Sequence, residues 1–120
     1  MIGYSTIGVK DIEAAKKFYC ELLDAEVLVD VGRLAMIGKS ADQPMVAVCE
    51  PVNGEAPSVA NGQMIALRGG SQEGAKAMYE ITIALGATDD GEPGSRIPDV
   101  FYGAYVKDPD GNKLCFLDFS

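Results

Sequence analysis

The same order of elements occurs twice along this chain, and this repetition limits the folds that it can adopt. In each half a short apolar stretch precedes a helical pattern, and several further β-type stretches follow. Ala15 and Tyr19 of the first helical pattern return sixty positions later as Ala75 and Tyr79 of the second. A fixed offset between similar units indicates a duplicated motif. We therefore predict two modules of strand, helix and further strands. The alternative is one undivided α+β domain of the ferredoxin-like kind, in which the similarity of the two halves is accidental.

The first module, at about residues 1–52, is predicted to contain one helix and four strands. Small and β-branched residues alternate over residues 2–9, which predicts a half-buried first strand. Asp11 is suited to cap a helix that ends near Asp24, because its carboxylate can accept from a main-chain N–H of the first turn. Further strands are expected at residues 26–31, 33–37 and 45–49.

The second module, at about residues 62–120, is predicted to repeat this plan. A strand at 63–67 leads to a helix that Ser71 caps and that runs to Leu85, with Gly86 in the position of a left-handed terminal residue. The two glycines and two prolines of residues 88–99 predict a long irregular loop, with at most a short strand near Ala87.

The module is expected to end in a hairpin. Its strands, at 101–106 and 113–119, are joined by Asp108-Pro-Asp-Gly111. Pro109 fixes its own φ angle, and Gly111 can adopt a positive one, which is typical of a tight turn. Residues 51–62 contain Pro, Gly, Asn and Ser without an apolar period, so they are interpreted as the link between the modules.

Composition indicates the kind of protein. At 120 residues and 48% apolar, the chain is predicted to form a single domain over residues 1–120. Its net charge of −8 disfavours phosphate backbones and anionic lipid surfaces, so neither nucleic acid nor a membrane is expected as a partner. Cys20, Cys49 and Cys115 form no Cys-x-x-Cys pair, and this usage favours a reducing cytoplasm. The apolar start is short and lacks a basic region, so it is interpreted as a strand and not as a signal peptide.

Several segments together resemble one family. The closing hairpin, Tyr102-Gly-Ala-Tyr-Val-Lys-Asp-Pro-Asp-Gly-Asn-Lys-Leu-Cys-Phe-Leu-Asp118, resembles that of the glyoxalase/bleomycin-resistance/dioxygenase superfamily, the vicinal oxygen chelate proteins. Residues 1–9, 11–19, 62–67 and 85–94 are similar to other parts of the family pattern. The resemblance implies an α+β fold of two βαβββ modules, whose curved mixed sheets enclose a cleft with the helices outside. It also implies a homodimer.

The resemblance places metal ligands at positions where this chain carries other side chains. The histidine expected in each module's first strand falls at Tyr4 and at Met64, and the glutamate of the last strand falls at Cys115. A fourth position falls near Ala47, and the chain has no histidine. Divalent ions prefer carboxylate and imidazole ligands, and one thiolate does not hold zinc. We therefore expect neither a bound metal nor another cofactor. Copper(I) on Met64 and Cys115 and calcium on the acidic loop near Asp89 are weaker alternatives.

The cleft implied by this fold is expected to bind a small organic molecule. The residues predicted to line it are Tyr4, Thr6, Arg33, Ala47, Cys49, Met64, Tyr102 and Cys115. Tyr102 and Tyr105 lie on opposite faces of one strand, so at most one of them reaches the cleft. No catalytic residue is assigned.

Three functions are compatible with these features. The first is a small-molecule-binding protein without a catalytic metal, of the resistance or sequestration type. The second is a lyase or isomerase of the glyoxalase type, with a rearranged or metal-free acid–base site in which a tyrosine transfers protons. The third is a structural or regulatory interaction domain.

Overall fold

The computed structural model describes residues 4–40, 42–51, 53–59 and 62–119. The chain forms two compact units, residues 1–58 and 59–120. Residues 2 and 3 of the expected first strand lie outside the described residues. Within the described residues, neither helix is both long and apolar enough to cross a membrane.

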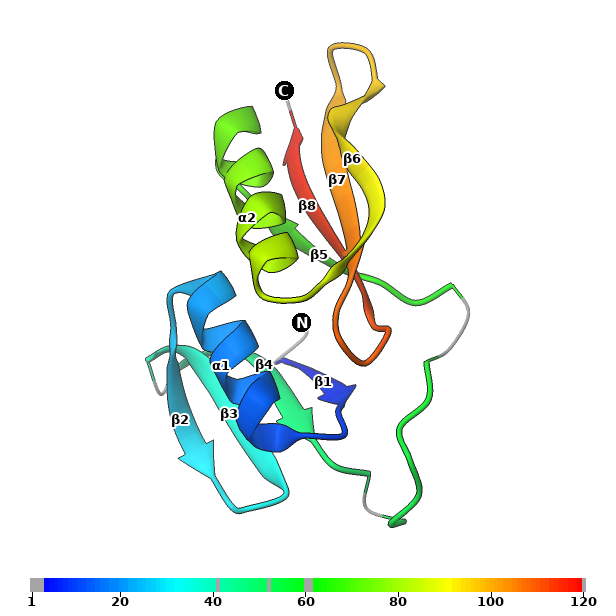
Figure 1. Cartoon of the computed structure of the whole chain (residues 1–120). Coiled ribbons are helices and arrows are strands. Elements are labelled where there is room, and N and C mark those ends of the chain that lie inside the picture. The colour runs from blue at the N-terminus through cyan, green and yellow to red at the C-terminus, as the bar shows by residue number, and fades with distance from the viewer. Residues whose placement is uncertain (1–3, 41, 52, 60–61, 120) are drawn as a thin grey trace. The chain divides into compact units, whose positions relative to one another are not determined.

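The first unit is a four-stranded mixed sheet with one helix against it (Figure 1). Its elements are β1 (Ser5–Gly8), α1 (Ile12–Leu23), β2 (Glu26–Asp30), β3 (Leu34–Ser40) and β4 (Gln43–Cys49). The strand order is β1-β4-β3-β2; β1 pairs with β4 in parallel, and the β2–β3 and β3–β4 pairs are antiparallel. The carboxylate of Asp11 accepts a hydrogen bond from the Ala14 N–H at 3.1 Å, which starts α1 as expected.

The second unit repeats this arrangement (Figure 1). Its elements are β5 (Ile65–Arg68), α2 (Gln72–Ala84), β6 (Thr88–Ile97), β7 (Phe101–Lys107) and β8 (Lys113–Phe119), in the strand order β5-β8-β7-β6. The Ser71 hydroxyl accepts from the Gly74 N–H at 2.9 Å and caps α2. Gly86 has a φ of 99° immediately after the helix, as predicted.

The predicted fold class is confirmed. Both units have the element order βαβββ and a mixed sheet, and the class is α+β. The alternative of one undivided ferredoxin-like domain is wrong, because the described strands form two four-stranded sheets.

The loop predicted for residues 88–99 is wrong over most of its length. Residues 88–97 form β6, which pairs with β7 through several register shifts. β6 is the edge strand of its sheet, so Pro93 can lie in it without removing a hydrogen bond from a neighbouring strand. The shifts near Gly91 and Gly94 absorb the irregular backbone.

The turn between β7 and β8 is held by the Asp108 side chain. One carboxylate oxygen, Oδ1, accepts from the N–H groups of Asp110 at 2.9 Å and Asn112 at 2.8 Å. The amide nitrogen of Asn112 donates to Oδ2 at 3.0 Å, and Gly111 has a φ of 91°. The predicted hairpin therefore forms around a buried carboxylate, which pins the register of both strands.

Candidate functional site

The sheet of the second unit has two chemically different faces. Side chains alternate between the faces along each strand, so residues in register share a face. Val106 pairs with Asp89, whose carboxylate accepts from the Tyr79 hydroxyl of α2 at 3.0 Å. This contact identifies the face that α2 covers. The neighbours of Val106 on that face, Leu114, Phe116 and Ala104, are fully buried.

The face opposite α2 carries the groups capable of chemistry. On this face Cys115 lies in register with Ala66 on β5 and with Tyr105 on β7. Arg68 and Leu117 form the next pair along the strands. A thiol, a phenol and a guanidinium group of this sheet thus share the face opposite the helix.

Tyr105 lies near two positive charges on this face. The guanidinium carbon Cζ of Arg96 lies 5.4 Å from the ring centroid, and the Lys113 amino nitrogen Nζ lies 5.1 Å from it. Both distances are within the range of a cation–π interaction. The ring fits because residue 91 is glycine, where a Cβ atom would lie 2.8 Å from Cδ2 of Tyr105. Lys113 also forms an ion pair with Asp90 at 3.2 Å.

Cys115 is fully buried next to Tyr105. Burial raises the pKa of its thiol above the ordinary value, because a thiolate is poorly solvated there. A hydrogen bond with Tyr105 and the charges of Lys113 and Arg96 oppose this increase in pKa without cancelling it. Cys115 is therefore a protonated thiol at neutral pH, which is a poor nucleophile and a poor metal ligand.

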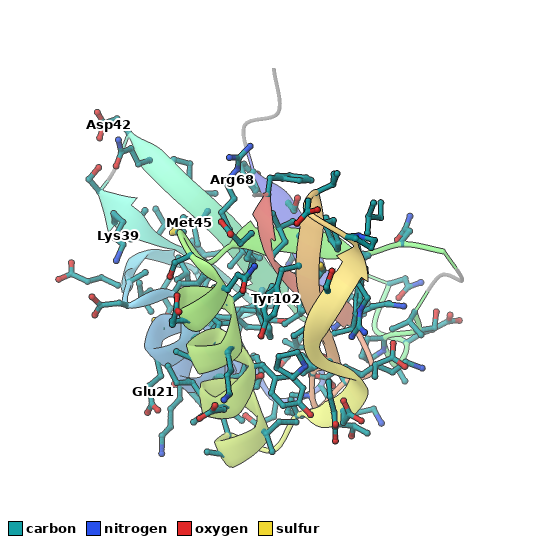
Figure 2. The ribbon with its side chains drawn as sticks, turned by 90° about the horizontal axis from the view of Figure 1, so that it is seen from above. Glu21, Lys39, Asp42, Met45, Arg68 and Tyr102 are labelled. Atoms are coloured by element: carbon teal, nitrogen blue, oxygen red, sulfur yellow. The ribbon has the colours of Figure 1, made fainter. Side chains whose placement is uncertain are left out.

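Arg68 and two phenylalanines form a second cluster on the same face. Cζ of Arg68 lies 5.8 Å from the ring centroid of Phe119. The Phe101 ring meets Phe119 edge-on, with 5.5 Å between centroids. A Cβ at Gly103 would lie 2.7 Å from Cε1 of Phe101, so the ring can occupy this position because residue 103 has no side chain. Phe119 is 58% exposed, and Figure 2 shows Arg68 near the C-terminal end of β8.

In the first unit, three of the predicted site residues share the sheet face opposite α1. Thr6 of β1 lies in register with Ala47 of β4, and Gly8 of β1 lies in register with Cys49 of β4. The adjacent positions Ile7 and Val48 point the other way and are buried in the core. Thr6 is exposed, Cys49 is half-buried and Ala47 is fully buried.

Tyr4 and Arg33 precede strands of this unit. Tyr4 comes one residue before β1 and is 46% exposed; the alternation of the strand puts it on the face of Thr6. Arg33 comes one residue before β3 and is exposed. Its Nη1 donates to the main-chain oxygen of Glu50 at 3.5 Å, and Glu50 directly follows the last residue of β4. This hydrogen bond therefore places the guanidinium at the end of the sheet. The structure does not bring it against Thr6, Ala47 or Cys49 within the described contacts.

The remaining predicted residues belong to the second unit. Met64 comes one residue before β5, is 45% exposed and lies by alternation on the face of Ala66 and Cys115. Tyr102 pairs with Asp118 and lies on the face that α2 covers; Figure 2 shows it between α2 and the strands. The tyrosine beside Cys115 is Tyr105.

The prediction did not place Tyr105, Arg96 or Lys113 at the site, although one signal was available. Counting outward from the Asp108–Gly111 turn pairs Lys107 with Lys113 and therefore Tyr105 with Cys115. The position of Arg96 had no such signal, because the register shifts of β6 cannot be read from its sequence.

The side chains at the family's metal positions do not fit a hard or borderline divalent ion. They offer a phenol at Tyr4, a methyl group at Ala47, a thioether at Met64 and a buried protonated thiol at Cys115. Among the described residues, no group of three or more Cys, Asp or Glu side chains is placed to hold a metal ion. Carboxylate and imidazole, the ligands that such ions prefer, are missing from these four positions.

Comparisons with known proteins agree on one family. The model of the Glyoxalase/Bleomycin resistance protein/Dioxygenase superfamily matches residues 1–116. Among proteins with curated functions, none matches this chain. A glyoxalase/bleomycin resistance protein from Albidiferax ferrireducens T118 is 33% identical, with a TM-score of 0.83 over 98% of this chain and 97% of that one.

Two further structures show a similar fold at lower identity. The fosfomycin resistance protein FosX from Listeria monocytogenes, complexed with Mn(II) and a sulfate ion, is 17% identical, with a TM-score of 0.78 over 100% of this chain and 90% of that one. A lactoylglutathione lyase from Agrobacterium tumefaciens is 21% identical, with a TM-score of 0.70 over 98% of this chain and 92% of that one. The family match, the 33% identity and the twofold βαβββ architecture lead to one conclusion: this chain belongs to the Glyoxalase/Bleomycin resistance protein/Dioxygenase superfamily.

Proposed function

We propose that this chain binds a small organic molecule, without a catalytic metal, on sheet faces that its helices leave uncovered. The observation that carries the proposal is the exchange of side chains at the four metal positions for groups that do not fit a divalent ion. The face opposite α2 supports it, because apolar and cationic groups lie there together. Met64, Ala66 and Phe119 on this face are exposed and can contact a ligand.

Each unit carries residues that are proposed to contact a ligand. In the second unit they are Met64 and Tyr105 with their neighbours on the face opposite α2. In the first unit they are Tyr4, Thr6 and Cys49 on the face opposite α1. Superfamily neighbours support a small ligand, since two of them are named for fosfomycin resistance and for lactoylglutathione lyase activity.

A metal-free lyase or isomerase is the second candidate function. The observation that favours it is the placement of Tyr105 beside Cys115 and near both Arg96 and Lys113. A phenol next to two cations can donate a proton to a developing negative charge. Tyr105, and not the Tyr102 of the same strand, is the residue proposed for this role.

We also propose that the protein is a cytoplasmic homodimer. The thiols of Cys20, Cys49 and Cys115 are all free, which suits a reducing compartment. β2 is an edge strand with exposed Val27 and Val29, and edge strands of this kind invite pairing with another chain.

One screen tests the proposed function and separates the two candidates. Purified protein is analysed for bound metals, and its melting temperature is then measured with a library of metabolites and aromatic compounds and with divalent ions. A ligand at 100 times its Kd stabilises the native state by about 2.7 kcal/mol, which corresponds to a shift on the order of 10 °C for a domain of this size. Each hit is then incubated with the protein and followed by mass spectrometry.

The expected result is a substoichiometric metal content, no stabilisation by divalent ions and at least one organic hit that is recovered unchanged. A hit that is converted into a new product would favour the lyase or isomerase. A stoichiometric divalent ion in the purified protein, or a library without any hit, would contradict the proposed function.

A further inference from the structure

The distribution of charge on the face opposite α2 differs from that of the whole chain. The chain carries 18 acidic and 10 basic residues, so most of its surface is expected to be negative. On this face, however, Arg68, Arg96 and Lys113 all lie against aromatic rings of one sheet. A concentration of positive charge on an acidic protein attracts anions locally.

The three cations are not equally available. Lys113 is paired with Asp90, and Arg96 donates to the main-chain oxygen of Glu92 while it lies on Tyr105. The contact that Arg68 makes is with the Phe119 ring. Within the part of the chain that the structure describes, no carboxylate forms an ion pair with Arg68. Among the described residues, therefore, none of the carboxylates competes with a ligand for its guanidinium N–H groups.

Apolar surface lies directly beside this guanidinium. Phe119 is 58% exposed and is held edge-on by Phe101. Ala66, two residues before Arg68 on the same face of β5, is exposed and has a small side chain. β5 is an edge strand, so a ligand can approach this corner from the side of the sheet.

We propose that this corner binds an organic anion, with its planar apolar body against Phe119 and its charged group on Arg68. The planar guanidinium group carries a fork of N–H donors that matches two oxygens of a carboxylate, sulfonate or phosphate. Arg96 and Lys113 add positive potential along the same face. This inference rests on the proposed small-molecule binding and names the chemical class of the ligand.

The test compares two probes of the same shape and different charge, 2-naphthoate and 2-naphthamide. Each is titrated into the ¹⁵N-labelled full chain, and amide chemical shifts give the site and the Kd. The variants are Arg68→Gln, Arg68→Lys and, as the matched control, Lys76→Gln, which removes an exposed positive charge from α2 in the same unit. Spectra of the free variants show whether each is folded before a Kd is compared.

We expect 2-naphthoate to shift the amides of Ala66, Arg68 and Phe119 and to bind at least about 10-fold more tightly than 2-naphthamide, as charge-assisted hydrogen bonds are typically strong. Arg68→Gln should remove this difference, Arg68→Lys should keep part of it and Lys76→Gln should leave it unchanged. Added salt should weaken 2-naphthoate alone.

Equal affinity of the two probes, or an unchanged 2-naphthoate Kd in Arg68→Gln, would overturn the inference. If neutral library hits shift these amides and 2-naphthoate does not, small-molecule binding stands and the preference for an anion is wrong. A library without hits overturns the proposed function itself, which separates the two failures.

Discussion

Cys115 falls where the family resemblance places a metal-ligating glutamate, but burial determines its chemistry. Its side chain is inaccessible, and burial raises its pKa despite two nearby cations. The thiolate is the reactive form, so both effects protect this cysteine. We expect iodoacetamide at pH 8 to modify Cys115 at least about 100-fold more slowly in the native protein than in urea, because labelling requires local or global opening.

Mass spectrometry of timed samples measures this rate for each cysteine. The half-buried Cys49 serves as the internal control, and its labelling should slow much less on folding. Rapid labelling of Cys115 in the native protein would instead indicate a stabilised thiolate. That result would favour the metal-free lyase or isomerase over the binding protein.

Single residues of the site were predictable only where the local backbone is regular. The hairpin turn fixes the register of β7 and β8, so the partnership of Tyr105 with Cys115 follows from counting. The contact of Arg96 with Tyr105 does not, because it depends on the bulges of β6. Arg68 on Phe119 joins two strands that are far apart in sequence, and no local pattern indicates that contact.

The helices were predicted well because their caps and stripes are local signals. Asp11 and Ser71 cap α1 and α2 as expected. β6 was missed because its glycines and Pro93 are typical of loops, and only its place at the edge of the sheet makes them tolerable. An edge position is set by the pairing of distant strands, which short-range patterns do not contain.

The start of α2 packs against the end of β5 through two glycines. A Cβ atom at Gly74 would lie 2.0 Å from the main-chain oxygen of Gly69. Replacing a helical glycine with alanine normally stabilises by about 1 kcal/mol, because alanine has the better helix propensity. Here the overlap with main-chain atoms should dominate, and we expect Gly74→Ala to lower the free energy of unfolding by about 1–3 kcal/mol.

Urea unfolding followed by circular dichroism measures this change. Gly94→Ala is the matched control, since a Cβ there would meet only ordinary contacts, 3.7 Å from Arg96 and 4.0 Å from Glu92. Its effect should be within about 0.5 kcal/mol of zero. A stabilised Gly74→Ala variant would show that the helix can move away from Gly69 at little cost.

At the scale of the whole molecule, the question is whether the two units unfold together. Each unit contains about half of the chain, and a domain of roughly 60 residues buries so little surface that it is only marginally stable alone. We therefore predict that residues 1–120 behave as one cooperative domain. β4 and β8 are inner strands of the two sheets. If the chain unfolds as one domain, the slowest-exchanging amides of these two strands have the same free energy of opening.

The Gly74→Ala variant tests this prediction directly, because the substitution destabilises the second unit and leaves the sequence of the first unit unchanged. Native-state hydrogen exchange by NMR compares Val48 of β4 with Phe116 of β8 in the parent protein and in the variant. One cooperative domain loses protection equally at both amides, since both exchange through the same global unfolding. If protection falls at Phe116 while Val48 keeps its original value, the units unfold independently, and a ligand bound to one of them would stabilise only that unit.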